Sequence, residues 1–362
     1  MKVTVIFLLY NASATTAALV DAISAQQHPH FESQSEWLDV VFMDDRSSDN
    51  TLAELDQALS RIGSPPNYHL EMNPTNLGLA RTLNKVLGRV QTRYALTCHL
   101  DCFFGSETYV ADMLNLIDRH PEAAAIAGQP TLPLEEIGLA EKINLISNLM
   151  PILPPSKNAE VEPVGFAEGR CDIFRIEALK AVGYYDTALR VAGEDQFLAG
   201  KLRDAGYEIY RAGRLKYSLR ASTEQNSIGK LVKHVFRFGK VHPFILVRHR
   251  RTAEGVVGRR AGGNMQIRTL LRVWQVISVA AYVTSLIALV SGASLAVVLL
   301  PVGVALVGKL ILFSRHLRFV SPGALETLVL FAVQPLLDVA YVAGLLLGGW
   351  LMLVGSPERP IT

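Results

Sequence analysis

The chain has 362 residues, enough for one large domain or two domains of ordinary size. Its 35 Lys and Arg against 33 Asp and Glu leave a net charge of +2, so the total charge indicates no strongly basic or acidic partner. Its three cysteines cannot form a closed disulfide framework, which argues against a disulfide-stapled scaffold and favours a reducing compartment.

The first half of the chain alternates short apolar runs, rich in β-branched residues, with helical patterns. The apolar runs predict strands at Val3–Leu9, Leu38–Met43, Tyr68–Glu71 and Tyr94–Leu100. The helical patterns lie near Thr15–Ala25, Thr51–Arg61 and Leu79–Val90. Such alternation is typical of an α/β fold with a mainly parallel sheet flanked by helices. Because Met1 leads straight into the first strand, we expect no signal peptide and a soluble part in the cytoplasm.

Polar residues follow each expected strand. They are Tyr10 and Asn11 after the first, Asp44 and Asp45 after the second, Asn76 and Gly78 after the third, and Asp101 after the fourth. In parallel sheets, ligands bind beyond the carboxyl ends of the strands. For a single acid at a strand end, capping of the next helix is a sufficient explanation. Asp49, which precedes Thr51, can have this role. Four polar strand ends at one sheet edge indicate a shared binding site.

The apolar segment Leu139–Leu153 precedes Pro154 and Pro155. It has two interpretations, an amphipathic helix on a membrane surface or a helix packed in the core. The sequence alone leaves both open.

Two adjacent carboxylates, Glu194 and Asp195, start another expected helix within Val191–Gly206. Apolar residues recur behind them at helical spacing, and Gly206 stands where a C-terminal cap belongs. The helix dipole also favours acids in a first turn, so capping is the alternative to a functional role. The acidic strand ends upstream favour the functional role.

From Lys230 to Arg272 the chain carries eleven Lys and Arg and one acidic residue, Glu254. We expect this stretch to lie on anionic lipid, gaining on the order of 1 kcal/mol per Lys or Arg near the surface. Nucleic-acid binding is the weaker interpretation, because the stretch directly precedes apolar runs. Within it, the glycine-rich Gly255–Gly263 is expected either to close over a substrate or to serve as a linker.

Apolar runs dominate the remainder of the chain. Val273–Val290 and Leu295–Phe313 are each long enough to cross the ~30 Å hydrocarbon layer as a helix, and Ser291–Ser294 makes them a hairpin. The third run, Leu325–Val354, is longer than one crossing needs and contains Pro335. It predicts either a tilted or kinked span, or an interfacial turn followed by a span.

Basic flanks such as Arg268 and Arg318 predict that the open end of the hairpin faces the cytoplasm and that the tail after Val354 lies outside. We expect Lys309 to reach the interface, and Asp338 to face another helix or a lipid headgroup. These features predict a multi-pass protein of the cell (inner) membrane, with membrane lipids as partners.

Several segments resemble the motifs of family 2 glycosyltransferases, which have the GT-A fold. Val40–Thr51 resembles the nucleotide-binding signature of that family, and Asn76–Asn84 its next motif. Gly165–Arg175, followed by Val182–Asp186, resembles the acceptor-side segment, and Gly193, Glu194 and Asp195 match the catalytic-base motif.

The likeness covers about residues 1–245, with matching order and spacing. It implies a GT-A glycosyltransferase domain at 1–245, a basic juxtamembrane linker at 246–272 and about three transmembrane helices at 273–354.

The resemblance also implies roles for individual residues. Asp195 would be the catalytic base, with Glu194 binding the acceptor or orienting its neighbour. The nucleotide-binding candidates are Tyr10, Asn11, Asp44, Asp45, Asn76, Gly78, Arg81 and Asn84. The acceptor-side candidates are Glu168, Gly169 and Arg170. The candidates for contact with the diphosphate are Lys233, His234 and Arg237, for which a lipid-facing charge stripe is the other interpretation.

The metal motif departs from the family. The family usually has Asp-x-Asp after the fourth strand, holding a divalent cation, whereas this chain has His99, Asp101 and Phe103 at these positions. One carboxylate therefore remains, Asp101. A cation such as Mg²⁺ or Mn²⁺ can bind through one carboxylate plus substrate phosphates, so metal dependence stays open.

The family implies transfer of a sugar from a nucleoside diphosphate donor, of UDP or GDP type, with inversion. A hydroxyl acceptor needs a base to remove its proton, whereas a polyprenyl phosphate is already an anion. The carboxylates of Glu194 and Asp195 therefore favour a hydroxyl of a lipid-linked saccharide or glycolipid, as in the assembly of a cell-envelope polysaccharide. Transfer to a polyprenyl phosphate is the runner-up. An inactive relative acting as a binding protein is a third possibility, supported only by Phe103.

Overall fold

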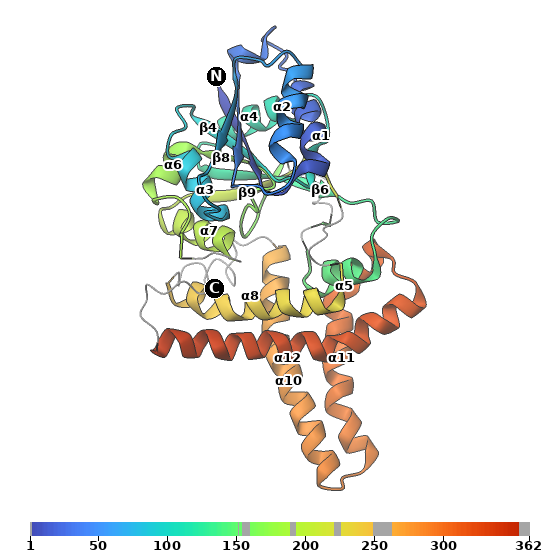
Figure 1. Ribbon diagram of the computed structural model, residues 1–362. Helices are drawn as coiled ribbons and strands as arrows, with labels where there is room; N and C mark the ends of the chain where they lie inside the picture. The colour runs from blue at the N-terminus through green and yellow to red at the C-terminus, as the bar shows by residue number, and fades with distance from the viewer. Residues whose placement is uncertain are drawn as a thin grey trace.

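The computed structural model describes residues 2–150, 152–153, 160–188, 193–220, 226–248 and 263–354. Figure 1 shows an α/β domain above a layer of long helices, from which two further helices project. The glycine-rich segment expected at Gly255–Gly263 lies, except for its last residue, outside the described residues.

The first half of the chain folds as its pattern predicts. The strands are β1 (Val3–Leu9), β2 (Leu38–Asp44), β3 (Tyr68–Met72) and β4 (Tyr94–Cys98). They alternate with helices α1 (Ser13–Ser24), α2 (Thr51–Arg61) and α3 (Leu79–Leu87). Each lies within a few residues of its predicted range, because periodicity identifies an element better than its ends.

The second half of the domain has shorter strands and helices. In chain order they are β5 (Cys102–Phe104), α4 (Tyr109–Arg119), β6 (Ala123–Thr131), α5 (Leu139–Ser147), β7 (Val161–Pro163), β8 (Cys171–Arg175), α6 (Ile176–Ala181), α7 (Glu194–Asp204), β9 (Glu208–Leu219) and α8 (Ile228–Arg248).

One sheet holds all these strands, in the order β3-β2-β1-β4-β8-β6-β9-β5, with β7 paired to β9. The four strands β3, β2, β1 and β4 are parallel, and β8 runs antiparallel between β4 and β6. Leu9 is in register with Asp44, and Asp44 with Met72. The carboxyl ends of the parallel strands therefore meet at one edge, as predicted.

Both faces of the sheet are covered by helices. Side chains alternate along β1, so Val5 and Phe7 pack on one face and Ile6 on the other. Phe7 stacks on Phe42 with ring centroids 5.1 Å apart in the core shared with α1, α2 and α4. The opposite face packs against α3, α6 and α7, so this second core carries the helix with Glu194 at its first position.

Three C-terminal helices are long and apolar enough to cross a membrane: α10 (Gly263–Val290), α11 (Leu295–Val320) and α12 (Ala324–Val354). The first two form the predicted hairpin, in which Trp274 Nε1 donates to the Ala305 carbonyl at 2.9 Å. The hairpin projects from the helix layer, and α12 runs across its base (Figure 1). Pro335 lies inside α12, which is one helix throughout.

The expectation that Lys309 reaches the membrane interface is wrong. Its side chain is fully buried, and Nζ lies 2.6 Å from Asp338 Oδ1. The carboxylate of Asp338, also fully buried, needs a positive partner in an apolar setting. Asp338 thus faces neighbouring helices, one of its two predicted environments.

Helix α5 is packed in the protein, the second of the two interpretations of Leu139–Leu153. It ends at Ser147, and Ile143 and Ile146 are buried in a cluster shared with α8, α11 and α12. Lys142 on α5 pairs with Glu326 on α12 at 2.8 Å. The helix therefore joins the α/β domain to the C-terminal helices.

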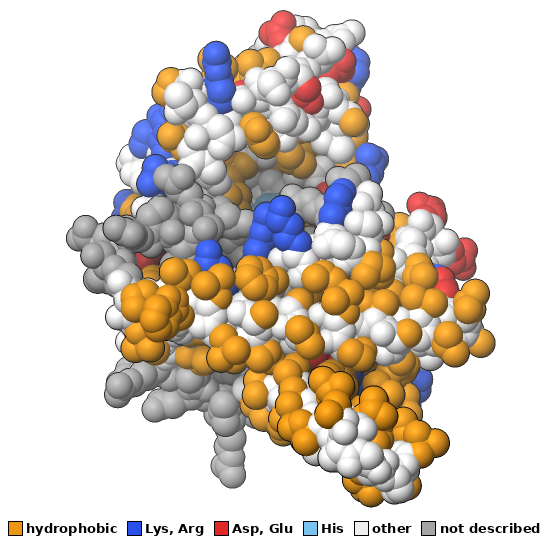
Figure 2. Space-filling view, turned by 60° about the horizontal axis from the view of Figure 1, so that its bottom comes forward, with side chains coloured by type: hydrophobic (Ala, Val, Ile, Leu, Met, Phe, Trp, Pro, Cys, Tyr) orange, Lys and Arg blue, Asp and Glu red, His pale blue; other side chains and the backbone are white. Residues whose placement is uncertain are grey.

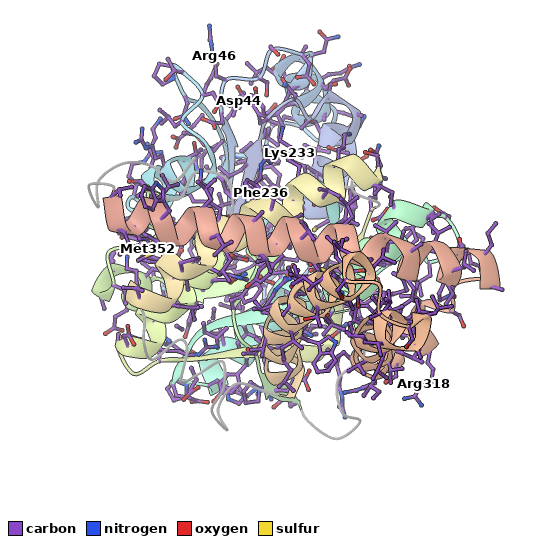
Figure 3. The ribbon with its side chains drawn as sticks, turned by 90° about the horizontal axis from the view of Figure 1, so that it is seen from below. Asp44, Arg46, Lys233, Phe236, Arg318 and Met352 are labelled. Carbon is purple, nitrogen blue, oxygen red and sulfur yellow. The ribbon has the colours of Figure 1, made fainter. Side chains whose placement is uncertain are left out.

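The contact between α8 and α12 is made by backbone on backbone. A Cβ at Gly344 would lie 2.2 Å from the Phe236 carbonyl oxygen, and one at Gly348 would lie 2.0 Å from that of Lys240. A Cβ at Gly239 of α8 would likewise lie 2.2 Å from the Tyr341 carbonyl oxygen. Seen from below in Figure 3, α8 with Phe236 lies against α12. Glycine at these positions is what allows the two helices to touch.

Replacing Gly344 by alanine should destabilise the protein, because the new methyl group forces the α8 and α12 backbones apart. We expect a cost of about 1–3 kcal/mol, as for overpacking elsewhere. The matched control is Gly349→Ala, five residues along the same helix, where a Cβ would meet nothing within 4 Å. Thermal unfolding of the full chain in detergent should show a lower midpoint for G344A alone. Equal midpoints would refute the close packing.

Candidate active site

The loops after β1 and β2 are joined by hydrogen bonds. Ser48 donates its backbone N–H to Asn11 Oδ1 at 2.9 Å, and Asn11 has a left-handed φ of 50°. Asp44 is fully buried and accepts the backbone N–H of Ser47 at 3.0 Å and its hydroxyl at 2.5 Å. Tyr10 extends outward and is 50% exposed. Tyr10 and Asn11 are therefore exposed to a ligand, whereas Asp44 is used within the protein.

Asp45 holds the next loop in place. Its Oδ1 accepts hydrogen bonds from Asn73 Nδ2 and the Leu77 N–H, and its Oδ2 accepts the Gly78 N–H, each at 2.8 Å. The exposed fraction of Asp45 is 6%. Its carboxylate therefore shapes the loop from Asn73 to Gly78, a role that its position after the strand did not reveal.

Asp49 accepts hydrogen bonds from backbone N–H groups at the starts of two helices, the role of a helix-capping acid. Its carboxylate accepts the backbone N–H of Thr51 at 3.0 Å and that of Ser13 at 3.1 Å, and also the Thr51 hydroxyl. Slight burial acts to raise the pKa of Asp49, but the hydrogen bonds from Thr51 and Ser13 lower it to about 2. This acid joins the starts of α1 and α2 and is not part of the shared site.

The candidates around α3 have different surroundings. Asn76 and Arg81 are exposed, and Gly78 caps the helix with φ of 80°. Asn84 donates to the Tyr185 carbonyl at 2.8 Å and accepts the Tyr185 N–H at 2.9 Å. Asn84 thus anchors the turn that leads towards α7, and its amide is used by the protein itself.

The adjacent carboxylates begin α7, after Gly193 with φ of 85°. Asp195 Oδ1 accepts the backbone N–H of Gln196 at 2.7 Å. Burial, and then the negative charges of Glu194 and Glu168, raise the pKa of Asp195 well above its ordinary value. Burial also raises the pKa of Glu194. Within the described residues, Glu194 Oε2 is buried and has no hydrogen-bond partner.

The predicted acceptor-side segment brings a charged pair beside α7. Glu168 Oε2 lies 3.2 Å from Arg170 Nε, and between them Gly169 has φ of 73° and donates to Asp172 at 2.7 Å. Burial alone would raise the pKa of Glu168, but the positive charges led by Arg170 hold it below its ordinary value. Burial and the charge of Glu168 raise the pKa of Asp172 to about 6.

The metal-motif positions diverge in space. Phe103 is partly buried against the core, and the Arg220 guanidinium lies over its ring, 4.4 Å from the centroid. His99 and Asp101 share one electrostatic neighbourhood with Arg170. Burial lowers the pKa of His99, against the opposing effect of the Asp101 carboxylate. Among the described residues, no group of three or more His, Cys, Asp or Glu side chains is arranged to hold a metal.

Two arginines at the site were not among the candidates predicted from the sequence. Arg268 was expected to lie on lipid, but its side chain is turned into the protein. Its guanidinium lies 5.5 Å from the Phe166 ring centroid, and its Nε donates to the Asn148 carbonyl at 3.3 Å. Arg211 on β9 is 5% exposed, and in the described part of the chain its Nε and Nη1 have no hydrogen-bond partner. Both arginines interact electrostatically with Glu168.

Helix α8 adds one group to this neighbourhood. Burial, then the charges of Arg272 and Arg237, lower the pKa of His234 to about 4, and Arg170 contributes in the same sense. Lys233 and Arg237 are exposed on the helix surface. Figure 3 shows Lys233 and Phe236 on α8 as it crosses beneath the domain.

The site residues thus fall into two groups. The first group is at the strand ends: Asn11, Asp44, Asp45 and Gly78. The second group surrounds the start of α7: His99, Asp101, Glu168, Arg170, Glu194 and Asp195. Strand pairing connects them, because β4, which leads to His99, lies directly beside β1.

Comparison with known proteins gives this arrangement a class. The profile described as Glycosyl transferase family 2 matches residues 4–183. The chain is similar to the mannosyltransferase PcManGT from Pyrobaculum calidifontis, solved with GDP-Man and Mn²⁺, at 16% identity and a TM-score of 0.56, over 96% of this chain and 87% of that one. It is similar to GalNAc-T7, solved with UDP, GalNAc and Mn²⁺, at 12% identity and a TM-score of 0.50, over 68% of this chain and 51% of that one. No curated protein sequence matched.

The similarity to solved structures shows that the domain has the GT-A fold, followed by long apolar helices, which confirms the predicted fold. Through the domain at residues 4–183, the chain belongs to glycosyl transferase family 2. It is therefore a glycosyltransferase, as the resemblance implied.

The hydrogen bonds of Asp45 predict a structural role that can be separated from nucleotide binding. Asp45→Ala removes the acceptor of two backbone N–H groups and of one Asn73 amide N–H, while Asn73 keeps its hydrogen bond to Thr82, so we expect a loss of about 2 kcal/mol or more in the ligand-free protein. The control is Arg81→Ala, at an exposed position nearby. A lower unfolding midpoint for D45A without nucleotide supports the role, and an unchanged midpoint contradicts it.

Proposed function

We propose that this enzyme transfers a sugar, with inversion at the anomeric carbon, to a hydroxyl group of a lipid-linked saccharide or glycolipid at the cytoplasmic face of the membrane. The donor is a nucleoside diphosphate sugar of UDP or GDP type. The catalytic domain would occupy residues 1–245, the juxtamembrane linker 246–272 and the membrane helices 273–354. One observation carries the proposal, the partly buried Asp195 at the start of α7 with Glu194 and Glu168 nearby.

Asp195 is suited to be a general base for a hydroxyl. A hydroxyl group has too high a pKa to react as it stands, so its proton must leave during the attack. Because burial and two neighbouring carboxylates raise the pKa of Asp195, it is a stronger base than an exposed aspartate. In the transfer, the acceptor oxygen bonds to the anomeric carbon, its proton passes to Asp195, and the donor C–O bond breaks with its electron pair on the diphosphate.

The leaving diphosphate needs positive charge nearby. Arg170 provides a guanidinium close to His99 and Asp101 at the end of β4. If a divalent cation binds, Asp101 and His99 would hold it together with the donor phosphates, and it would add positive charge there. The two similar enzymes were both solved with Mn²⁺, which supports a metal here.

The nucleotide would bind at the strand-end group. Tyr10 and Arg81 have exposed side chains for the base and ribose, and Asn11, Asp44, Asn76, Gly78 and Asn84 would shape or line the same edge. Lys233 and Arg237 remain candidates for contact with the diphosphate, because both are exposed on α8.

A polyprenyl phosphate acceptor is the second candidate. Arg211 favours it, because Nε and Nη1 are buried and lack hydrogen-bond partners among the described residues, and a phosphate would satisfy both. Such an acceptor needs no base. The two candidates therefore differ in how much transfer depends on Asp195.

Replacing Asp195 by asparagine should lower transfer to a hydroxyl acceptor by roughly 10²–10⁴-fold, the usual contribution of a general base, while donor binding persists. The donor is first identified by its hydrolysis in a panel of nucleotide sugars, with and without Mn²⁺. Asp204→Asn, at the exposed other end of α7, is the control and should leave the rate unchanged. Full activity of D195N would remove the base assignment and favour the phosphate acceptor.

Glu194 should set the pH at which activity appears. Asp195 acts when deprotonated, so activity rises as the pH passes upward through its raised pKa. Glu194→Gln removes one negative charge that raises this pKa, so the acidic limb should move to lower pH by on the order of one unit. The measurement is kcat/KM against pH, with Glu177→Gln, exposed on α6, as a control for charge. A limb that does not move means that Glu194 does not tune the base.

A further inference from the structure

We infer that α12 does not cross the membrane but lies flat in its interface, as an apolar support beneath the catalytic domain, while the α10–α11 hairpin alone enters the lipid. The partner of its exposed face is the lipid layer itself. This replaces the expected third span and does not depend on which acceptor the enzyme uses.

The α10–α11 hairpin and α12 point in different directions. In Figure 1 the hairpin projects away from the domain, and α12 runs across its base beneath α8. In Figure 3, seen from below, α12 extends across the whole molecule while the hairpin is viewed nearly end-on. A bilayer has one normal, so the hairpin and α12 do not both lie along it.

The contacts agree with this crossing. Asp338, midway along α12, accepts a hydrogen bond from the Tyr282 hydroxyl at 2.9 Å and pairs with Lys309. Lys309 also donates to Gln334 at 2.9 Å. Beyond Tyr282 towards the tip, large side chains such as Val290 and Leu300 are 81% and 69% exposed. The hairpin therefore meets α12 at this buried polar cluster and at apolar contacts such as Phe313 on Phe331, and its outer part extends beyond them with exposed apolar side chains.

Burial along α12 divides the helix into two faces. One face is buried from Leu330 to Gly348 against α8, α5 and the hairpin. The opposite face is exposed and apolar along the whole helix. Its large residues include Leu325, Leu328, Leu336, Val339, Leu346, Trp350 and Leu353. These positions follow one another at intervals of three, four, seven or eight residues, so they form a single stripe.

Length separates the two orientations. The 31 residues of α12 make a helix of about 46 Å, whereas the hydrocarbon layer is about 30 Å thick. An upright α12 would leave apolar surface in water at its ends. Lying flat, the whole stripe meets lipid at one depth, and the protein already covers the other face. Trp350 on the stripe suits this depth, because tryptophan is enriched at membrane interfaces.

The charges above the stripe fit the same placement. Figure 2 shows a continuous apolar surface over α12 and the hairpin, with Lys and Arg side chains directly above it. Lys233 and Arg237 of α8 are exposed, as are Arg315 and Arg318 at the open end of the hairpin. A basic row at the height of anionic headgroups adds on the order of 1 kcal/mol per side chain.

The orientation has a consequence for catalysis. Phe244 of α8 stacks on Phe197 of α7 with centroids 5.7 Å apart, and Met352 of α12 packs on the same cluster. The start of α7, with Asp195, thus rests on α8, which in turn rests on α12. An acceptor anchored in the membrane reaches this height with its headgroup while its chain stays in the lipid.

The test measures depth along α12 with nitroxide labels. Single cysteines replace exposed residues, Leu325→Cys, Leu336→Cys, Leu346→Cys and Leu353→Cys, in the full chain reconstituted in vesicles of neutral and anionic phospholipid. The three native cysteines are buried, which keeps background labelling low. Power saturation by oxygen and by a polar nickel complex gives the depth of each label, with sugar-nucleotide hydrolysis as the check of folding.

We expect that the four labels on α12 lie at the same shallow depth in the membrane and that all four are accessible to oxygen. Matched labels on the hairpin, Val276→Cys near its base and Ile287→Cys near its tip, should differ in depth by about 16 Å if it stands along the normal. A depth profile in α12 with a middle about 15 Å deeper than its ends would show a span and overturn the proposal. Labels shielded from oxygen, or broadened by a second copy, would show a protein partner and overturn it too.

The side of the tail provides a second measurement. A flat α12 leaves the residues after Val354 on the side of the catalytic domain, whereas three spans place them across the membrane. Ser356→Cys and Ala53→Cys, the latter exposed on α2, are labelled with an impermeant maleimide in sealed vesicles of one orientation. Labelling of both from the same side supports the proposal, and labelling from opposite sides refutes it.

Discussion

Close packing of α8 between α7 and α12 determines where the active site lies. On one side, Gly239, Gly344 and Gly348 bring the α8 and α12 backbones into contact. On the other, a Cβ at Gly193 would lie 2.8 Å from Val241 Cγ1, so the residue before Glu194 touches α8 directly. Glycine removes the side chains that would separate these layers. The height of Asp195 above the apolar helices is therefore set by van der Waals contact rather than by a flexible tether.

Electrostatics determines what this position can do. Glu168, Glu194 and Asp195 are partly buried together, an arrangement that costs free energy unless cations offset it or protons are retained. Arg170 and Arg268 offset the charge at Glu168, whereas Asp195 keeps a raised pKa. One carboxylate remains ionised and its neighbour becomes a stronger base. Arg268 comes from α10, the first of the long apolar helices, so this C-terminal part of the chain contributes directly to the balance.

Local pattern predicted much of the fold and identified the chemically important positions. The β1–β4 strands, the hairpin and the helix behind Glu194 all have clear periodicity, and the acids at strand ends were found from the same pattern. Local pattern did not separate ligand-binding residues from those that build the loops. Asp44, Asp45 and Asn84 are used within the protein, by Ser47, Gly78 and Tyr185. Such hydrogen bonds join segments far apart in the chain, which a motif does not record.

The sequence by itself determined the α/β order, the placement of carboxylates at one sheet edge and the existence of long apolar helices. These follow from side-chain period and from the direction of parallel strands, which are local properties. Only the tertiary structure decided that Lys309 pairs with Asp338, that Arg268 turns inward and that α12 crosses the base of the hairpin. Hydropathy measures how apolar a helix is but not its direction, because direction depends on which face meets a neighbour. Here the direction of α12 is determined by the close contact at the glycines of α8 and α12 and by the buried ion pair between Lys309 and Asp338.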